Sequence, residues 1–68
     1  MPSQTDLIHA SLLAGDQLTA IEALRRFQCF RLAARIADLR AQGERIESHM
    51  VDVGGGKRVA RYRLEREP

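Results

Sequence analysis

Residues 19–43 read TAIEALRRFQCFRLAARIADLRAQG, and this stretch holds two short helical patterns of different phase. The first pattern opens with Thr19 and Glu22, which form a capping box that satisfies free backbone donors at a helix start. It predicts a helix that begins at residue 19 or 20 and ends near residue 27. The apolar stripe of this helix consists of Ile21, Leu24 and Phe27.

The second pattern predicts a helix over residues 29–42, which Gly43 ends. Leu32, Ile36 and Leu39 recur at i, i+4 and i+7 and form its buried stripe. Small and charged residues occupy the other side of the helical wheel: Arg31, Ala34, Arg35 and Asp38. We expect Cys29 to be buried and Phe30 to pack on the core over the turn.

The flanking segments complete one small domain that spans residues 1–68, with an ordered core over about 4–64. Ser3 and Asp6 cap a predicted helix over residues 4–14, which ends before the turn residues Gly15 and Asp16. Residues 45–53 and 57–64 alternate in side-chain type as strands do, with three glycines, Gly54–Gly56, between them. The C-terminal part is therefore predicted to be one β-hairpin.

The charge of the chain is unevenly distributed. Residues 1–24 contain three acidic residues and no Lys or Arg, whereas residues 25–63 contain ten Lys or Arg and four acidic residues. A basic middle and end is what a phosphate-facing surface requires. Because ten of the eleven cations are arginine, which a GC-rich genome supplies without selection for DNA contact, charge alone decides nothing.

Three helices followed by a β-hairpin indicate an α+β fold, the winged helix-turn-helix. In this arrangement the helix over residues 29–42 enters the DNA major groove, and the glycine-tipped hairpin is the wing that contacts backbone or minor groove. The predicted DNA-binding residues are those of the two contact elements, together with the start of the second helix, where a backbone amide can meet phosphate. They are Thr19, Arg31, Ala34, Arg35, Asp38, Lys57, Arg58 and Arg61.

The run LRRFQCFRLAARIADLR at residues 24–40, with RVARY at residues 58–62, resembles the small helix-turn-helix domain proteins of bacteriophages and prophages. The resemblance covers roughly residues 5–64. It implies a winged-helix fold and a DNA-binding role. The family often has glycine at the position of Gln28, and if that position needs a positive φ, Gln28 costs about 1 kcal/mol.

Other classes of function find little support in the residues. His9, Cys29 and His49 lie twenty residues apart, without the paired spacing of a zinc site, so no metal is expected. No nucleophile, base and orienting group can be assembled, so we expect a non-enzyme without cofactor or small-molecule ligand. One cysteine and the lack of an 18-residue apolar run predict a cytoplasmic protein without a membrane span.

The hypothesis is a module that binds double-stranded DNA, as a small bacterial or prophage transcriptional regulator. Homodimerisation on a two-fold operator is the expected route to useful affinity. Two alternatives stay open, since a fold does not determine a function. One is a protein-interaction adaptor, and the other is a module that binds structured RNA, whose narrow major groove excludes a helix.

Overall fold

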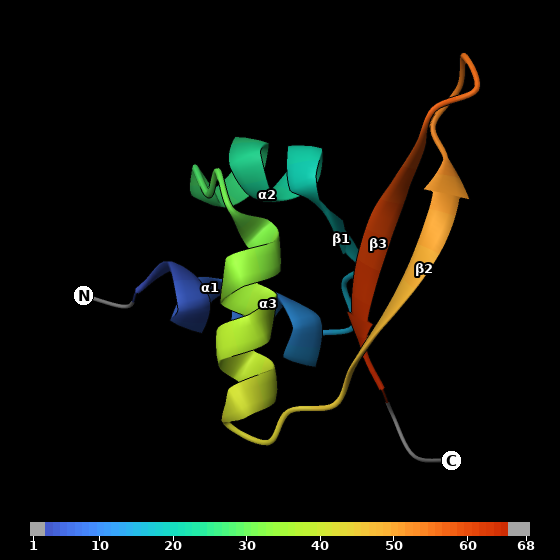
Figure 1. Ribbon diagram of the computed structural model, residues 1–68. Coiled ribbons are helices and arrows are strands. Elements are labelled where there is room, and N and C mark those ends of the chain that lie inside the picture. The colour runs from blue at the N-terminus through green and yellow to red at the C-terminus, as the bar shows by residue number, and fades with distance from the viewer. Residues whose placement is uncertain (1–2, 66–68) are drawn as a thin grey trace.

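The computed structural model describes residues 3–65 and shows three helices packed beside a three-stranded sheet (Figure 1). The ends of the predicted domain, residues 1–2 and 66–68, lie outside the described residues. The helices are α1 (Gln4–Leu13), α2 (Ala20–Phe27) and α3 (Leu32–Ala41). The strands are β1 (Leu18–Thr19), β2 (Ile46–Asp52) and β3 (Arg58–Leu64). The winged helix-turn-helix fold expected from the sequence is confirmed.

The sheet has the order β1-β3-β2, and both pairs of neighbouring strands are antiparallel. The predicted hairpin is present as β2 and β3, in a register that pairs Ile46 with Leu64 and Asp52 with Arg58. The sequence allowed an extended Gln17 and Leu18 before the second helix but did not predict a third strand; β1 is that strand and pairs Leu18 with Tyr62. Two residues are too short for a period-2 pattern, and Leu18 is held there by complete burial rather than by strand propensity.

One core joins the three helices to the near face of the sheet. Tyr62 and Leu64 of β3 pack against it from the sheet side. Cys29 is buried as expected. The buried apolar residues are Ile8, Leu12, Leu18, Ala23, Cys29, Leu32, Ile36, Leu39 and Ile46.

The capping box predicted for α2 is present, and the predicted N-cap of α1, Ser3, forms a second capping box with Asp6. Ser3 accepts from the Asp6 amide at 3.1 Å, and the Asp6 carboxylate accepts from the Ser3 amide at 3.2 Å. Thr19 and Glu22 make the corresponding pair of bonds at the start of α2, each at 3.3 Å. These bonds explain why α1 and α2 begin where the sequence predicted, because each satisfies two backbone groups that a helix start leaves open.

The predicted range of the third helix, residues 29–42, is wrong at its start. Helix α3 begins at Leu32, three residues later, and Arg31 is its N-cap with φ −133° and ψ 65°. The reason is the turn that precedes it. Gln28 adopts the left-handed region with φ 54°, and the Cys29 amide donates backward to the Ala23 carbonyl at 3.2 Å. Residues 29–31 are thereby committed to the turn.

Three apolar side chains that the sequence placed inside lie outside. Phe30 was expected to pack on the core and is instead 84% exposed, because the turn directs it outward. Ile21, assigned to the apolar stripe of α2, is 56% exposed, and Leu24 is also exposed. Of the predicted stripe, Phe27 does pack against the core, and Ala23 is the buried residue of α2 beside it.

The left-handed conformation of Gln28 leads to a stability prediction. A residue with a side chain pays a steric cost in this region that glycine does not pay. Gln28→Gly is therefore expected to raise the free energy of unfolding by about 0.5–1 kcal/mol, measured by urea denaturation. Gln42→Gly is the matched control, because Gln42 ends α3 with φ −83° and offers glycine no such relief. A lower stability for Gln28→Gly would contradict the expectation.

Candidate nucleic-acid interface

Arg31 and Arg35 lie where α3 emerges from the turn. Arg31 is exposed at the N-cap position, and its side chain makes no capping bond. Arg35 lies one turn later and is partly covered, with 37% of its side chain exposed. Both line a shallow cavity of about 220 Å³ together with Gln4, Cys29 and Phe30. The structure therefore brings the two predicted arginines together, although Arg31 precedes the helix instead of lying on it.

Arg35 is engaged within its own helix. Its Nη2 lies 3.2 Å from Oδ2 of Asp38, an ion pair at i, i+3 spacing. Its Nε is buried and has no hydrogen-bond partner among the described residues. Two predicted site residues, Arg35 and Asp38, thus form one unit with a defined geometry.

The outward side of α3 is otherwise built from small side chains. Ala33 and Ala37 are exposed, and the predicted contact residue Ala34 is half-buried. Side chains of this size let a helix approach a surface closely, and their methyl groups suit contact with thymine methyl groups.

The wing ends in a tight turn made by the three glycines. All three have positive φ, at 103°, 62° and 76°, which is the reason that glycine is required at each position. Asp52 supports the turn by accepting from the Gly54 amide at 2.8 Å. The Lys57 amide donates to the Gly54 carbonyl at 3.1 Å. Lys57 and Arg58 follow directly and are both exposed.

The wing and the start of α3 lie toward the same end of the molecule. In Figure 1 the β2–β3 tip projects beyond the body toward the end at which α2 and the N-terminal turn of α3 are found. The wing tip, which Lys57 and Arg58 follow, and the turn before α3, which contains Arg31, therefore lie at one end of the domain.

The predicted phosphate contact of Thr19 does not fit the structure. Thr19 is buried, and its amide already donates to the Glu22 carboxylate at 3.3 Å. Its hydroxyl also donates to that carboxylate at 3.1 Å. The Thr19 amide, which the sequence interpretation assigned to a phosphate, is thus already bonded within the capping box. The acceptor is the negatively charged carboxylate of Glu22.

Arg61 lies apart from the wing tip. It is half-buried and pairs in register with Thr19 on one side and His49 on the other. Because successive strand residues point to opposite faces, Arg61 shares a face with these two residues and not with Tyr62, which packs on the core. Arg61 thus lies on the sheet face that points away from the core.

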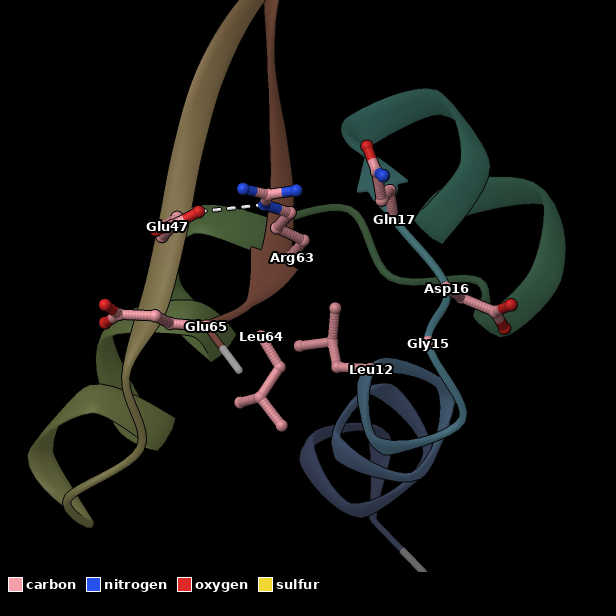
Figure 2. A pocket seen from close by; sticks show the side chains of 8 residues that line it. All are labelled: Leu12, Gly15, Asp16, Gln17, Glu47, Arg63, Leu64 and Glu65. Carbon is pink, nitrogen blue, oxygen red and sulfur yellow. Dashed lines mark hydrogen bonds and ion pairs between the residues drawn. The ribbon is translucent and has the colours of Figure 1, made fainter. Parts of the chain in front are cut away.

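The base of the hairpin is acidic rather than basic. A cavity of about 390 Å³ lies between the α1–β1 link and the base of the hairpin (Figure 2). Three carboxylates and one guanidinium group are among its lining residues, so it suits phosphate poorly. The lining residues are Leu12, Gly15, Asp16, Gln17, Glu47, Arg63, Leu64 and Glu65.

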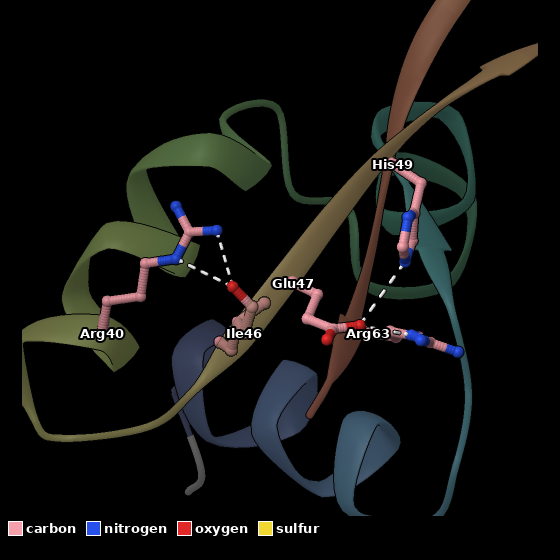
Figure 3. Close-up of polar contacts among 5 residues, drawn as sticks. All are labelled: Arg40, Ile46, Glu47, His49 and Arg63. Carbon is pink, nitrogen blue, oxygen red and sulfur yellow. Dashed lines mark hydrogen bonds and ion pairs between the residues drawn. The ribbon is translucent and has the colours of Figure 1, made fainter. Parts of the chain in front are cut away.

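Glu47 lies on the same sheet face as Arg61 and is the centre of the polar contacts there. It accepts from Arg63 Nε at 2.8 Å, and His49 Nε2 lies 3.5 Å from the same carboxylate oxygen (Figure 3). The hydrogen bond from Arg63 lowers the pKa of Glu47 below its ordinary value. On the other side of β2, Arg40 of α3 donates to the Ile46 carbonyl at 2.7 and 3.2 Å and ties the helix to the sheet.

The cations of the described residues differ in whether they have an intramolecular partner. Arg26, Arg35 and Arg63 form ion pairs with carboxylates. Arg40 instead donates to the Ile46 carbonyl. Within residues 3–65, five further cations have neither an ion-pair partner nor a side-chain hydrogen bond. Two of them lie on α2 or in the turn before α3, and three lie on the wing. These five are Arg25, Arg31, Lys57, Arg58 and Arg61. Cations without an intramolecular partner keep their full charge for a phosphate backbone.

Asp16 joins α1 to α2, and its charge should make stability depend on pH. It accepts from the buried Ser11 hydroxyl at 2.7 Å and pairs with Arg26 at 3.1 Å. The bond from Ser11, followed by that from Arg26, lowers the pKa of Asp16 below its ordinary value of 3.8. A depressed pKa stabilises the fold above 3.8, and this contribution is lost as the pH falls through the lower folded-state pKa.

The test compares the melting temperatures of the wild type and Asp16→Asn, measured by circular dichroism over a range of pH. The wild type should melt higher at neutral pH, and the difference should shrink once the pH falls below 3.8. A difference of the same size at every pH would show that the charge of Asp16 is not what stabilises this contact.

Two further findings concern the described part of the chain. Residues 3–65 contain no group of three or more His, Cys, Asp or Glu side chains placed to hold a metal ion. No helix in this range is long and apolar enough to cross a membrane.

Comparison with known proteins identifies the family. Residues 3–67 match the family model described as the winged helix-turn-helix domain, which is nearly the whole chain. No curated protein matches the chain, and no solved structure does. Such a domain suggests DNA as a partner in general, and domains of this kind typically bind without catalysing a reaction. The chain therefore belongs to the winged helix-turn-helix domain family.

Proposed function

We propose that this domain binds double-stranded DNA with α3 in the major groove and the wing on the adjacent backbone or minor groove. The observation that carries the proposal is the placement of cations without intramolecular partners. Arg31 is the N-cap of α3, and Lys57 and Arg58 follow the glycine tip of the wing. These two segments lie at the same end of the molecule (Figure 1). Two separated basic contacts of this kind suit a duplex, which presents a groove flanked by two phosphate strands.

The dimensions of the elements agree with this placement. An α-helix with its side chains is about 10–12 Å across, and the B-DNA major groove is about 12 Å wide. Ala33 and Ala37 on the outward side of α3 allow the helix backbone to come close to base edges. The positive-φ glycines give the wing a tip without side chains, which can lie against a sugar-phosphate strand.

The proposal extends to the setting in which the domain acts. Residues 1–68 form one domain that works as a small transcriptional regulator of bacterial or prophage type in the cytoplasm. A single copy makes few contacts, so two copies act on a two-fold operator with half-sites about one helical turn apart. The resemblance to small phage and prophage helix-turn-helix proteins and the match to the winged helix-turn-helix family support this role.

A salt titration tests DNA binding directly. The wild type is expected to bind a mixed-sequence 20-base-pair duplex, followed by fluorescence anisotropy, with a log–log salt slope near −4 to −5. This corresponds to about 4–6 neutralised phosphates. An RNA duplex of the same sequence is the competitor, and α3 should bind it more weakly because the A-form major groove is deep and narrow. No DNA binding at low salt, or stronger binding of RNA, would overturn the proposal.

A further inference from the structure

We infer that Asp38 positions Arg35 for base recognition, so that this pair sets the DNA sequence preference of α3 while Arg31 contributes affinity. The inference rests on the proposed function and specifies how the major-groove contact discriminates between sequences.

The two arginines at the start of α3 differ in how firmly they are held. Arg35 Nη2 is fixed by Asp38 Oδ2 at 3.2 Å, and its Nε is buried beside the small cavity. Arg31 is exposed and has no ion-pair partner within residues 3–65. A guanidinium that is already oriented loses less conformational entropy on binding and meets a defined geometry, which base recognition needs. An exposed cation without an intramolecular partner suits a phosphate, which accepts bonds from many directions.

The rest of the outward side of α3 offers no competing hydrogen bonds. Ala33 and Ala37 are exposed and Ala34 is half-buried, and methyl groups neither donate nor accept. Arg35 and Asp38 therefore supply the side-chain hydrogen-bonding groups in the middle of the exposed helix. In the middle of α3, hydrogen bonds that distinguish one base pair from another therefore have to be made by Arg35 and Asp38.

The hydrogen-bonding groups that Arg35 and Asp38 leave free match the edges of bases. Arg35 keeps donors on Nη1, which suit the O6 and N7 acceptors of guanine. Within the described residues, Asp38 Oδ1 accepts no hydrogen bond, so it can accept from the exocyclic amine of a neighbouring cytosine or adenine. The negative charge of Asp38 also repels phosphate, which lowers affinity for sequences that offer no amine.

The pair can be altered without unfolding the domain. Asp38 is half exposed at 50%, and Arg35 is 37% exposed, so an ion pair between them adds little to folding stability. Substitutions at position 38 therefore report on binding. The helix itself is held by its buried stripe on the opposite side.

The test begins with selection of a preferred duplex from a random pool by the wild-type protein. The measured quantity is the ratio of Kd for a scrambled duplex to Kd for the selected duplex. It is determined for the wild type, Asp38→Asn, Asp38→Glu, Arg35→Ala and the double variant Arg35→Ala/Asp38→Asn. Glu65→Gln is the charge-matched control, because it removes one negative charge at the base of the hairpin.

Asp38→Asn is expected to lower the ratio about tenfold, within the range of one bidentate base contact, and to bind the scrambled duplex more tightly than the wild type. Asp38→Glu should restore part of the ratio. In the Arg35→Ala background, Asp38→Asn should change the ratio no further, because the two residues act as one unit. Glu65→Gln should leave the ratio unchanged.

The experiment distinguishes a failure of this inference from a failure of the proposed function. A wild type that binds duplex DNA but selects no preferred sequence overturns this inference and leaves DNA binding in place. The same holds if Asp38→Asn leaves the ratio unchanged, or lowers it equally with and without Arg35. A wild type that binds no duplex overturns the proposed function and this inference together.

Discussion

Replacing Lys57 and Arg58 together by alanine is expected to weaken binding of a mixed-sequence duplex roughly 50-fold at about 0.1 M salt. Both side chains are exposed beside the glycine tip and lack an ion-pair partner within residues 3–65. Each phosphate contact gains about eightfold at this salt concentration from the counterions it releases. The log–log salt slope should become less steep by about 2, and the loss should be uniform across sequences.

A charge-matched variant separates a local contact from a change in net charge. Arg26→Ala/Arg63→Ala also removes two positive charges, but from guanidinium groups that already pair with Asp16 and Glu47. Its DNA affinity, measured where circular dichroism shows the folded state, should fall much less. Equal losses in the two double variants would mean that the wing makes no specific contact and that only net charge matters.

Ile36→Ala is expected to destabilise the domain by about 2–5 kcal/mol and to leave much of it unfolded at 37 °C. Ile36 is 1% exposed in the centre of the α3 stripe, so the substitution removes buried methyl groups and leaves a cavity. A chain of this length has a total stability of about 3–10 kcal/mol, which the loss consumes in large part. Thermal and urea denaturation measure the effect.

Ile21→Ala is the matched control for the same chemical change on the surface. Ile21 is 56% exposed on α2, and its substitution should cost less than about 1 kcal/mol. The sequence interpretation, which placed Ile21 in an apolar stripe facing the core, implies a much larger cost. A similar loss of stability in the two variants would contradict the burial described here.

Most of the fold could be predicted from the sequence because helix caps, apolar stripes and glycine turns each depend on a few neighbouring residues. A hydroxyl and a carboxylate three residues apart make a capping box wherever a helix begins, and both boxes lie where the sequence indicated. The buried stripe of α3 and the glycine-tipped hairpin follow from periodicity in the same way.

The start of α3 could not be read from periodicity because the turn competes with the helix for the same residues. Cys29 fits the helical stripe as a buried residue, yet its amide bonds back to Ala23. The left-handed Gln28 carries the chain into this turn, and a glutamine gives little sequence signal for a positive φ. Phe30 is displaced from the core for the same reason.

The candidate site was only partly predictable, because pairing between charges depends on the three-dimensional arrangement. Arg31 and Arg35 look equivalent in the sequence, one turn apart on a helical wheel. In the structure Arg35 is paired with Asp38, whereas Arg31 lies before the helix. Thr19 illustrates the reverse case: its capping box was recognised, but the same box occupies the amide that was proposed to meet phosphate.

We expect DNA to bind at the end of the molecule that carries the start of α3 and the wing. The most direct test is a titration of the ¹⁵N-labelled domain with a mixed-sequence duplex, followed by amide chemical shifts. The largest shifts should fall in residues 31–38 and 53–58, with little change around the acidic cavity at Asp16 and Glu65. Shifts concentrated at that cavity or on the exposed side of α2, with the wing unchanged, would contradict the account.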